Sequence, residues 1–137
     1  MSDDVKKSRP EFRNIHFVKD LPKYHWPMAS MVSGAHRFSG LLLFLLTPII
    51  LYFLDQSLLS EGTFAYLKDL SSGWFVKLII LAMAWGYLQH FCSGIRHLVM
   101  DLHIGLDKES ASKSGAGILA VTSALTILIA LKLFGAF

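Results

Sequence analysis

The segment WFVKLIILAMAWGYLQHFCSGIRHLVM, residues 74–100, gives the clearest indication of the fold. It is an almost unbroken apolar run in which the only formally charged residues are Lys77 near its start and Arg96 near its end. The hydrocarbon core of a bilayer is about 30 Å thick, and a helix needs about 20 residues to cross it. The run is therefore long enough to form a transmembrane helix.

Two further apolar segments flank this one. The first, Phe38–Leu54, contains no charge and can begin near Met28, and the third, Gly115–Phe137, contains only Lys132. The whole chain of 137 residues is 53% hydrophobic and 17% charged, which is too apolar for an ordinary soluble domain of this size. We therefore expect an all-α membrane protein with three transmembrane helices. The expected parts are a basic tail at 1–27 and a membrane domain at 28–137, with helices at about 28–54, 74–100 and 115–136 and a short connection at 55–73.

Basic residues are distributed unevenly between the two sides of this arrangement. With three spans, the tail and the loop 101–114 share one side, which carries ten Lys and Arg residues against three on the other. The positive-inside rule then predicts an N-terminus in the cytoplasm of a bacterium or, as the alternative, in the matrix of a mitochondrion. We expect contacts with membrane lipid and none with nucleic acid, because the cations lie in short segments beside the membrane.

The second helix carries polar residues on one narrow stripe. At 100° per residue, Gly94, His97 and Asp101 fall within about 40° of His90, whereas Arg96 points about 120° away. An ionisable group inside a bilayer usually faces protein, a cavity or a cofactor. His90 is therefore either hydrogen-bonded to a neighbouring helix or a ligand of a metal, for which haem iron is the leading candidate.

The neighbours of His90 allow two interpretations as well. Gly94 leaves space for a flat macrocycle, but it also suits close packing of helices. His97, Arg96 and Asp101 are either ordinary interfacial residues or counter-ions for haem propionates. No C-x-x-C-H sequence occurs, so a covalently attached haem is not expected.

The start of the first helix presents a second polar group at the same depth. Within SGAHRFSG, residues 33–40, the side chains of Ser33, His36 and Arg37 and the bare backbone of Gly40 share one face. Arg37 alone would be an ordinary interfacial cation. Together with Ser33 it can also donate hydrogen bonds to one small polar ligand, and a quinone carbonyl suits such donors.

The patterns S-x-x-H-R-x-S-G at 33–40 and H-x-x-x-G-I-R-H-x-x-x-D at 90–101 resemble those of the cytochrome b subunit of succinate dehydrogenase. The resemblance implies that His90 is an axial ligand of haem b, with the second ligand supplied by a smaller membrane anchor subunit. It implies a ubiquinone site lined by Ser33 and Arg37, and haem propionates near His36, Arg37 and His97. The further partners would be an iron–sulfur subunit and a flavoprotein subunit, which would hold the succinate site.

Other functions stay open at this point. The chain could be a purely structural anchor without a redox role, or the anchor of a fumarate reductase. A transporter fragment is disfavoured, because three helices without an internal repeat do not match transporter architecture.

Overall fold

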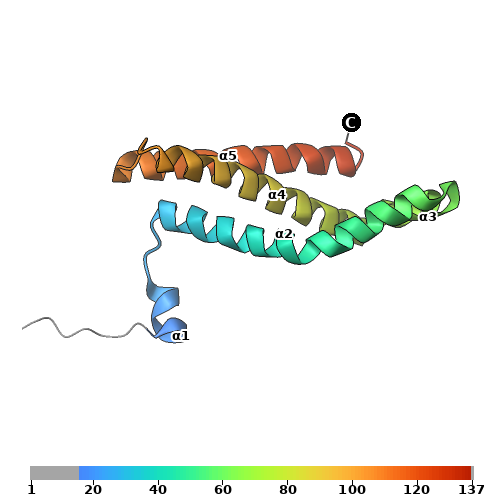
Figure 1. Ribbon diagram of the computed structural model, residues 1–137. Coiled ribbons are helices and arrows are strands. Elements are labelled where there is room, and N and C mark those ends of the chain that lie inside the picture. The colour runs from blue at the N-terminus through green and yellow to red at the C-terminus, as the bar shows by residue number, and fades with distance from the viewer. Residues whose placement is uncertain (1–15, 137) are drawn as a thin grey trace, which may run out of the picture.

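The structure is a computed structural model that describes residues 16–136, and this part of the chain is helical throughout apart from short connections. Residues 1–15 of the predicted basic tail therefore lie outside the described residues. Figure 1 shows the order of the elements along the chain. They are α1 (Phe17–Asp20), the 3-10 turn η1 (Leu21–Lys23), α2 (Met28–Leu59), α3 (Glu61–Ser72), α4 (Trp74–Asp101) and α5 (Lys108–Leu133).

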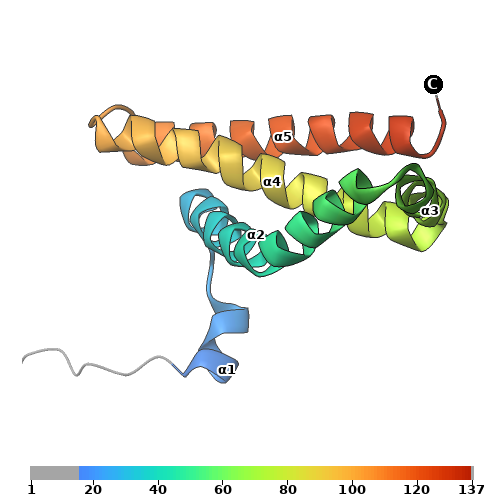
Figure 2. The same cartoon turned by 45° about the vertical axis from the view of Figure 1, so that its right-hand side comes forward.

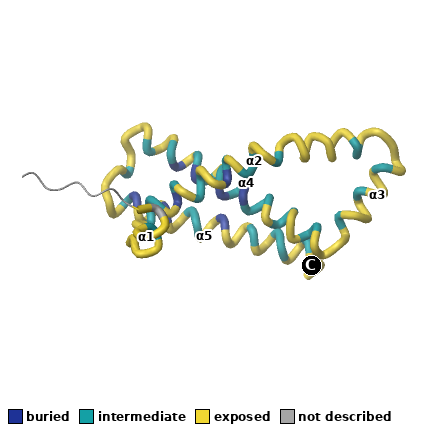
Figure 3. Tube along the Cα trace, turned by 90° about the horizontal axis from the view of Figure 1, so that it is seen from below, coloured by how far each residue is buried: buried dark blue, intermediate teal, exposed yellow. Residues whose placement is uncertain are grey.

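Three of these helices, α2, α4 and α5, are long and apolar enough to cross a membrane. Their large apolar side chains point outward: Phe44 is 75% exposed, Trp74 69% and Leu98 67%. Figure 3 shows this exposure along most of the trace. Apolar surface of this extent is stable only against lipid or other membrane helices. The chain is thus a multi-pass membrane protein, and the predicted all-α fold with three membrane helices is confirmed.

The long helices differ from the expected ranges mainly at their ends. Helix α2 continues to Leu59, five residues beyond the expected end, and α4 ends within one residue of its expected end. Helix α5 begins at Lys108 rather than 115, because the Asp107 side chain accepts a hydrogen bond of 2.8 Å from the Ser110 N–H and caps the polar first turn. It ends before Gly135, whose φ of 81° is unsuited to a helix.

The connection between the first two spans, which was predicted only as a short link at 55–73, consists mostly of helix α3. Helix α3 begins with a capping box: Ser60 Oγ accepts from the Thr63 N–H at 3.1 Å, and Thr63 Oγ1 accepts from the Ser60 N–H at 3.2 Å. These bonds satisfy N–H groups that a helix start otherwise leaves without partners.

Helix α4 lies between α2 and α5 and contacts both (Figures 1 and 2). Helix α2 bends where its colour turns from cyan to green, in the stretch that contains Pro48. Proline lacks the N–H for the i−4 carbonyl, and it commonly bends helices in this way.

The interior of the bundle is unusually polar. Among the described residues, the buried apolar side chains are only Val32 and Ala111. The buried polar side chains are Ser39, Gln89, Ser93, Arg96 and Thr122. Because buried polar groups need partners, their hydrogen bonds fix which face each helix turns inward.

Candidate functional site

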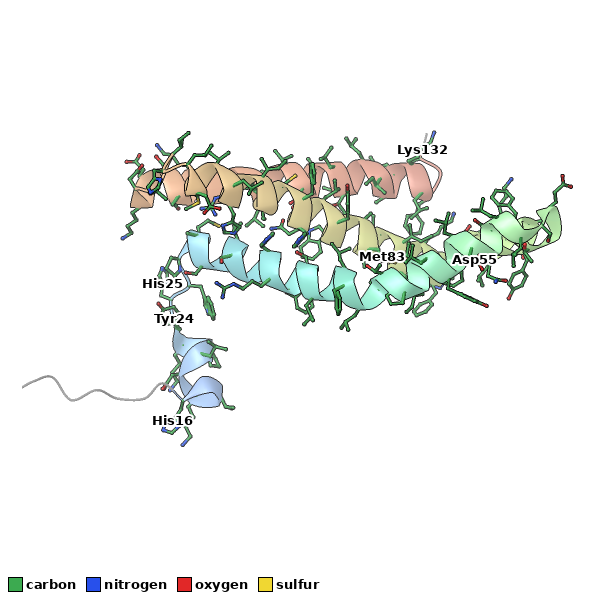
Figure 4. All side chains as sticks on the ribbon, viewed as in Figure 1. His16, Tyr24, His25, Asp55, Met83 and Lys132 are labelled. Carbon is green, nitrogen blue, oxygen red and sulfur yellow. The ribbon has the colours of Figure 1, made fainter. Side chains whose placement is uncertain are left out.

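A cluster of three histidines lies between α2 and α4. The His36 and His90 rings are stacked, with centroids 4.2 Å apart and planes 6° apart. The His97 ring lies 5.0 Å from the His36 ring. The side chains of α2 and α4 meet between the two ribbons, near the N-terminal end of α2 (Figure 4). The predicted stripe on α4 therefore faces α2, and its two imidazoles converge on His36.

The environment of His90 fixes which of its ring nitrogens carries the proton. Its Nδ1 lies 3.1 Å from the His36 backbone carbonyl oxygen, which can only accept a hydrogen bond. In the neutral imidazole Nδ1 is then the donor, and Nε2 keeps its lone pair. A carbonyl that holds the second ring nitrogen in this way is the usual support of a metal-binding histidine. The buried Ser39 hydroxyl donates to the same carbonyl at 2.9 Å.

Two glycines shape the space around the rings. A Cβ on Gly40 would stand 2.7 Å from His90 Cε1, closer than atoms can approach, so the position of the His90 ring requires glycine there. A Cβ on Gly94 would stand 3.5 Å from His36 Cε1, which is an ordinary contact. The His36 ring thus packs against Gly94.

His36 carries a polar atom without a hydrogen bond. Within residues 16–136, its Nδ1 is the buried side-chain nitrogen or oxygen atom that has no partner. A buried polar atom of this kind costs about 1–3 kcal/mol of folding free energy. A ligand oxygen beside His36 would remove that cost, so the cluster fits a cofactor with polar or anionic substituents.

The predicted quinone residues lie at the same end of α2 as the cluster. Ser33 is half-buried and the Arg37 side chain is exposed. In the part of the chain that the structure describes, neither side chain forms a hydrogen bond. Both donors are therefore available to a molecule bound at this end of the helix.

Arg96 has a different place from its neighbours on α4. It is only 7% exposed, and it donates from Nε to Ser114 Oγ and from Nη2 to the Ala111 carbonyl, both at 3.0 Å. The guanidinium thus joins α4 to α5, as its position about 120° from His90 allows. Arg96 belongs to the packing of the bundle, whereas Asp101 is exposed at the end of α4.

A further polar group, not predicted from the sequence, is fully buried between α4 and α5 and consists of Gln89, Ser93 and Thr122. Its signal was a glutamine inside an apolar run with a serine four residues later, a spacing that places both on one helix face. The hydrogen bonds of this group tie α4 to α5 directly behind the histidine cluster.

These features define a class of protein: a three-helix membrane protein with a cluster of imidazoles between two of its helices. Residues 7–129 match the family described as Succinate dehydrogenase/Fumarate reductase transmembrane subunit. The chain belongs to this family, and the resemblance found in the two motifs is confirmed.

Individual relatives agree with this membership, and each is a "Succinate dehydrogenase cytochrome b556 subunit". The one from Coxiella burnetii is 41% identical over 85 residues, which are 61% of this chain and 67% of the relative. The one from Paracoccus denitrificans is 29% identical over 114 residues, covering 83% of this chain and 88% of the relative. The one from Rickettsia prowazekii is 29% identical over 106 residues, covering 77% and 82%.

Proposed function

We propose that this chain is the haem-binding membrane anchor of a succinate dehydrogenase and contributes to its ubiquinone site. The proposal rests on the hydrogen bond from His90 Nδ1 to the His36 carbonyl oxygen, which leaves the lone pair of His90 Nε2 available to a metal. The partners would be a smaller membrane anchor, an iron–sulfur subunit and a flavoprotein. Succinate would be oxidised in the flavoprotein.

Haem b fits the residues of the cluster. His90 would be one ligand of the iron, and Gly94 and His97 would contribute to the haem-binding site. The orphan Nδ1 of His36 would donate to a propionate, and Arg37 would add a positive charge nearby. The second ligand of the haem iron would come from the smaller anchor, as the resemblance to the cytochrome b subunit implies. Bound haem b supplies a one-electron redox couple inside the membrane.

Ser33 and Arg37 are suited to bind ubiquinone. A serine hydroxyl can donate to a quinone carbonyl oxygen, and an exposed guanidinium can both donate and offset the negative charge that develops on reduction. The two residues are one helical turn apart near the N-terminal end of α2, where water is close enough to supply protons. Electrons would reach this site from the iron–sulfur subunit.

The site would face the cytoplasm of a bacterium. Ten of the thirteen Lys and Arg residues lie on the side of the N-terminal tail and the 101–114 loop, and that side should be cytoplasmic. The relatives described above are bacterial subunits of succinate dehydrogenases, which favours the bacterial inner membrane and succinate oxidation over fumarate reduction.

The quinone role can be tested in the complex co-expressed with its neighbouring subunits. Arg37→Ala should lower succinate-dependent ubiquinone reduction by a factor of about 10 to 100, because a charge-assisted hydrogen bond contributes about 1.5–3 kcal/mol. Ser33→Ala should have a smaller effect of the same sign. Reduction of a soluble dye by the flavoprotein should stay at the wild-type rate in both variants.

Ser57→Ala is the matched control for these variants. Ser57 lies near the other end of α2, and its hydroxyl donates only to the Leu54 carbonyl of the same helix. It should leave ubiquinone reduction unchanged. Wild-type ubiquinone reduction in Arg37→Ala would refute the quinone role and favour a structural anchor.

A further inference from the structure

The buried polar group between α4 and α5 is a continuous chain of hydrogen bonds. Gln89 Nε2 donates to Ser93 Oγ at 3.0 Å, and Gln89 Oε1 lies 3.0 Å from Thr122 Oγ1. The single proton of the Thr122 hydroxyl is shared between Gln89 Oε1 and the Ile118 carbonyl of α5, 2.9 Å away. All three side chains are 0% exposed. If the amide is turned by 180°, one of its ends still bonds to Thr122 and the other to Ser93, so the link between the helices does not depend on the amide orientation.

This link acts on the residue next to His90. Gln89 and His90 are adjacent in sequence, so their side chains leave α4 about 100° apart. Gln89 is tied to α5 through Thr122, while His90 is tied to α2 through the His36 carbonyl. These two hydrogen bonds, one to α5 and one to α2, therefore fix the rotation of α4 about its axis.

A second attachment strengthens the first. Arg96 follows Gln89 by seven residues, so it lies on almost the same stripe and about 10 Å further along the helix. It bonds to Ser114 and to the Ala111 carbonyl of α5. Two attachments on one stripe resist rotation of α4, and the membrane core holds no water to replace the bonds that rotation would break.

Small rotations of α4 would move the imidazole by amounts that matter for ligation. A group about 5 Å from a helix axis moves by about 0.9 Å when the helix turns by about 10°. The side chains of a functional site must lie within about 0.5 Å of their working positions. A hydrogen-bonded link that prevents such a rotation therefore fixes the direction in which the His90 side chain points.

We propose that Gln89 and Thr122 are positioning residues for the His90 imidazole, and that their amide–hydroxyl link fixes the rotation of α4 that directs His90 towards α2. The proposal rests on the proposed function in taking His90 as the haem ligand. It adds residues outside both family-like motifs, on a face of α4 about 100° from His90 and on α5.

The test uses the assembled complex and the electron paramagnetic resonance spectrum of its oxidised haem. The largest g value of a low-spin ferric haem depends on how its imidazole ligands are oriented, and a change in stability alone does not alter it. Thr122→Val removes the hydroxyl with little change in shape and should shift this g value. Thr122→Ser keeps the hydroxyl and should restore the wild-type value.

Two further variants complete the experiment. Thr126→Val is the matched control, because Thr126 lies one turn away on α5 and its hydroxyl donates only to the Thr122 carbonyl. It should leave the g value unchanged. Gln89→Met removes both hydrogen bonds of the amide at similar volume and should shift the g value at least as far as Thr122→Val.

The outcomes separate this proposal from the proposed function. A wild-type g value in Thr122→Val, or an equal shift in Thr126→Val, would overturn the positioning role while leaving His90 as a haem ligand. If the wild-type complex shows no b-type haem, or keeps it in His90→Ala, the proposed function fails and the positioning role fails with it.

Discussion

Replacing Gly40 with alanine places one methyl group directly against the imidazole of His90. The new Cβ would stand 2.7 Å from His90 Cε1 and 3.1 Å from Nδ1. Carbon atoms in contact rest about 3.5–4.0 Å apart, so the ring must withdraw by about 0.8 Å. Its hydrogen bond to the His36 carbonyl, already 3.1 Å long, would then be lost or badly strained.

The effect on folding stability should be small. Loss of one hydrogen bond costs about 0.5–1.5 kcal/mol. Replacing glycine with alanine in a helix interior stabilises the helix by about 1 kcal/mol. The two terms nearly cancel, so the complex with Gly40→Ala should assemble and unfold at close to the wild-type temperature.

The effect on haem should be large, because the same substitution removes the support of the ligand. Loss of such a support typically lowers metal affinity by a factor of about 10 to 100. We therefore expect the b-type absorption band, measured per assembled complex, to fall strongly in Gly40→Ala. Gly34→Ala is the matched control on the same helix, since nothing lies within 4 Å of its added Cβ. Full haem content in Gly40→Ala would refute the assigned position of the His90 ring.

Three other predictions concern the packing and the capping of the helices. Arg96→Ala removes two charge-assisted hydrogen bonds to α5 and should destabilise the bundle by about 3–6 kcal/mol, measured by thermal unfolding of the complex; an unchanged unfolding temperature would contradict its structural role. The hydrogen bond from the Ser110 N–H lowers the pKa of the Asp107 carboxyl, so the cap contributes its stability above the pKa of a free carboxyl and loses it as the pH falls through the lowered pKa. Protection of the Ser110 amide from hydrogen exchange, corrected for the intrinsic rate, should therefore decrease in acid, and Asp107→Asn should abolish this dependence. Ser60→Ala removes the capping box of α3 and should destabilise that helix by about 1 kcal/mol, detected as faster exchange in its first turn but not in α4.

The three spans could be predicted from sequence because membrane helices need long apolar runs, and hydropathy records these directly. Helix α3 could not be predicted in the same way. It is amphipathic and short, and its start depends on two hydroxyl–amide bonds between Ser60 and Thr63. The early start of α5 was hidden for the same reason, because its first turn is polar and is capped by Asp107.

Helical periodicity placed His90, Gly94 and His97 on one face, and it separated Arg96 from them. It could not show which neighbouring helix each face would meet. The contact between His90 and the His36 carbonyl joins residues 54 positions apart, and the link from Gln89 to Thr122 joins residues 33 positions apart. Such contacts depend on how the helices pack, which periodicity within one helix does not record.

The reduced-minus-oxidised visible spectrum of the complex, compared between wild type and His90→Ala, shows whether haem binding depends on His90. His103→Asn is the control, since His103 is exposed in the loop after α4 and its φ of 62° suits asparagine. We predict a b-type band in wild type and in His103→Asn, and its loss in His90→Ala at equal amounts of assembled complex. A b-type band of full height in His90→Ala would contradict the assignment of His90 as a haem ligand.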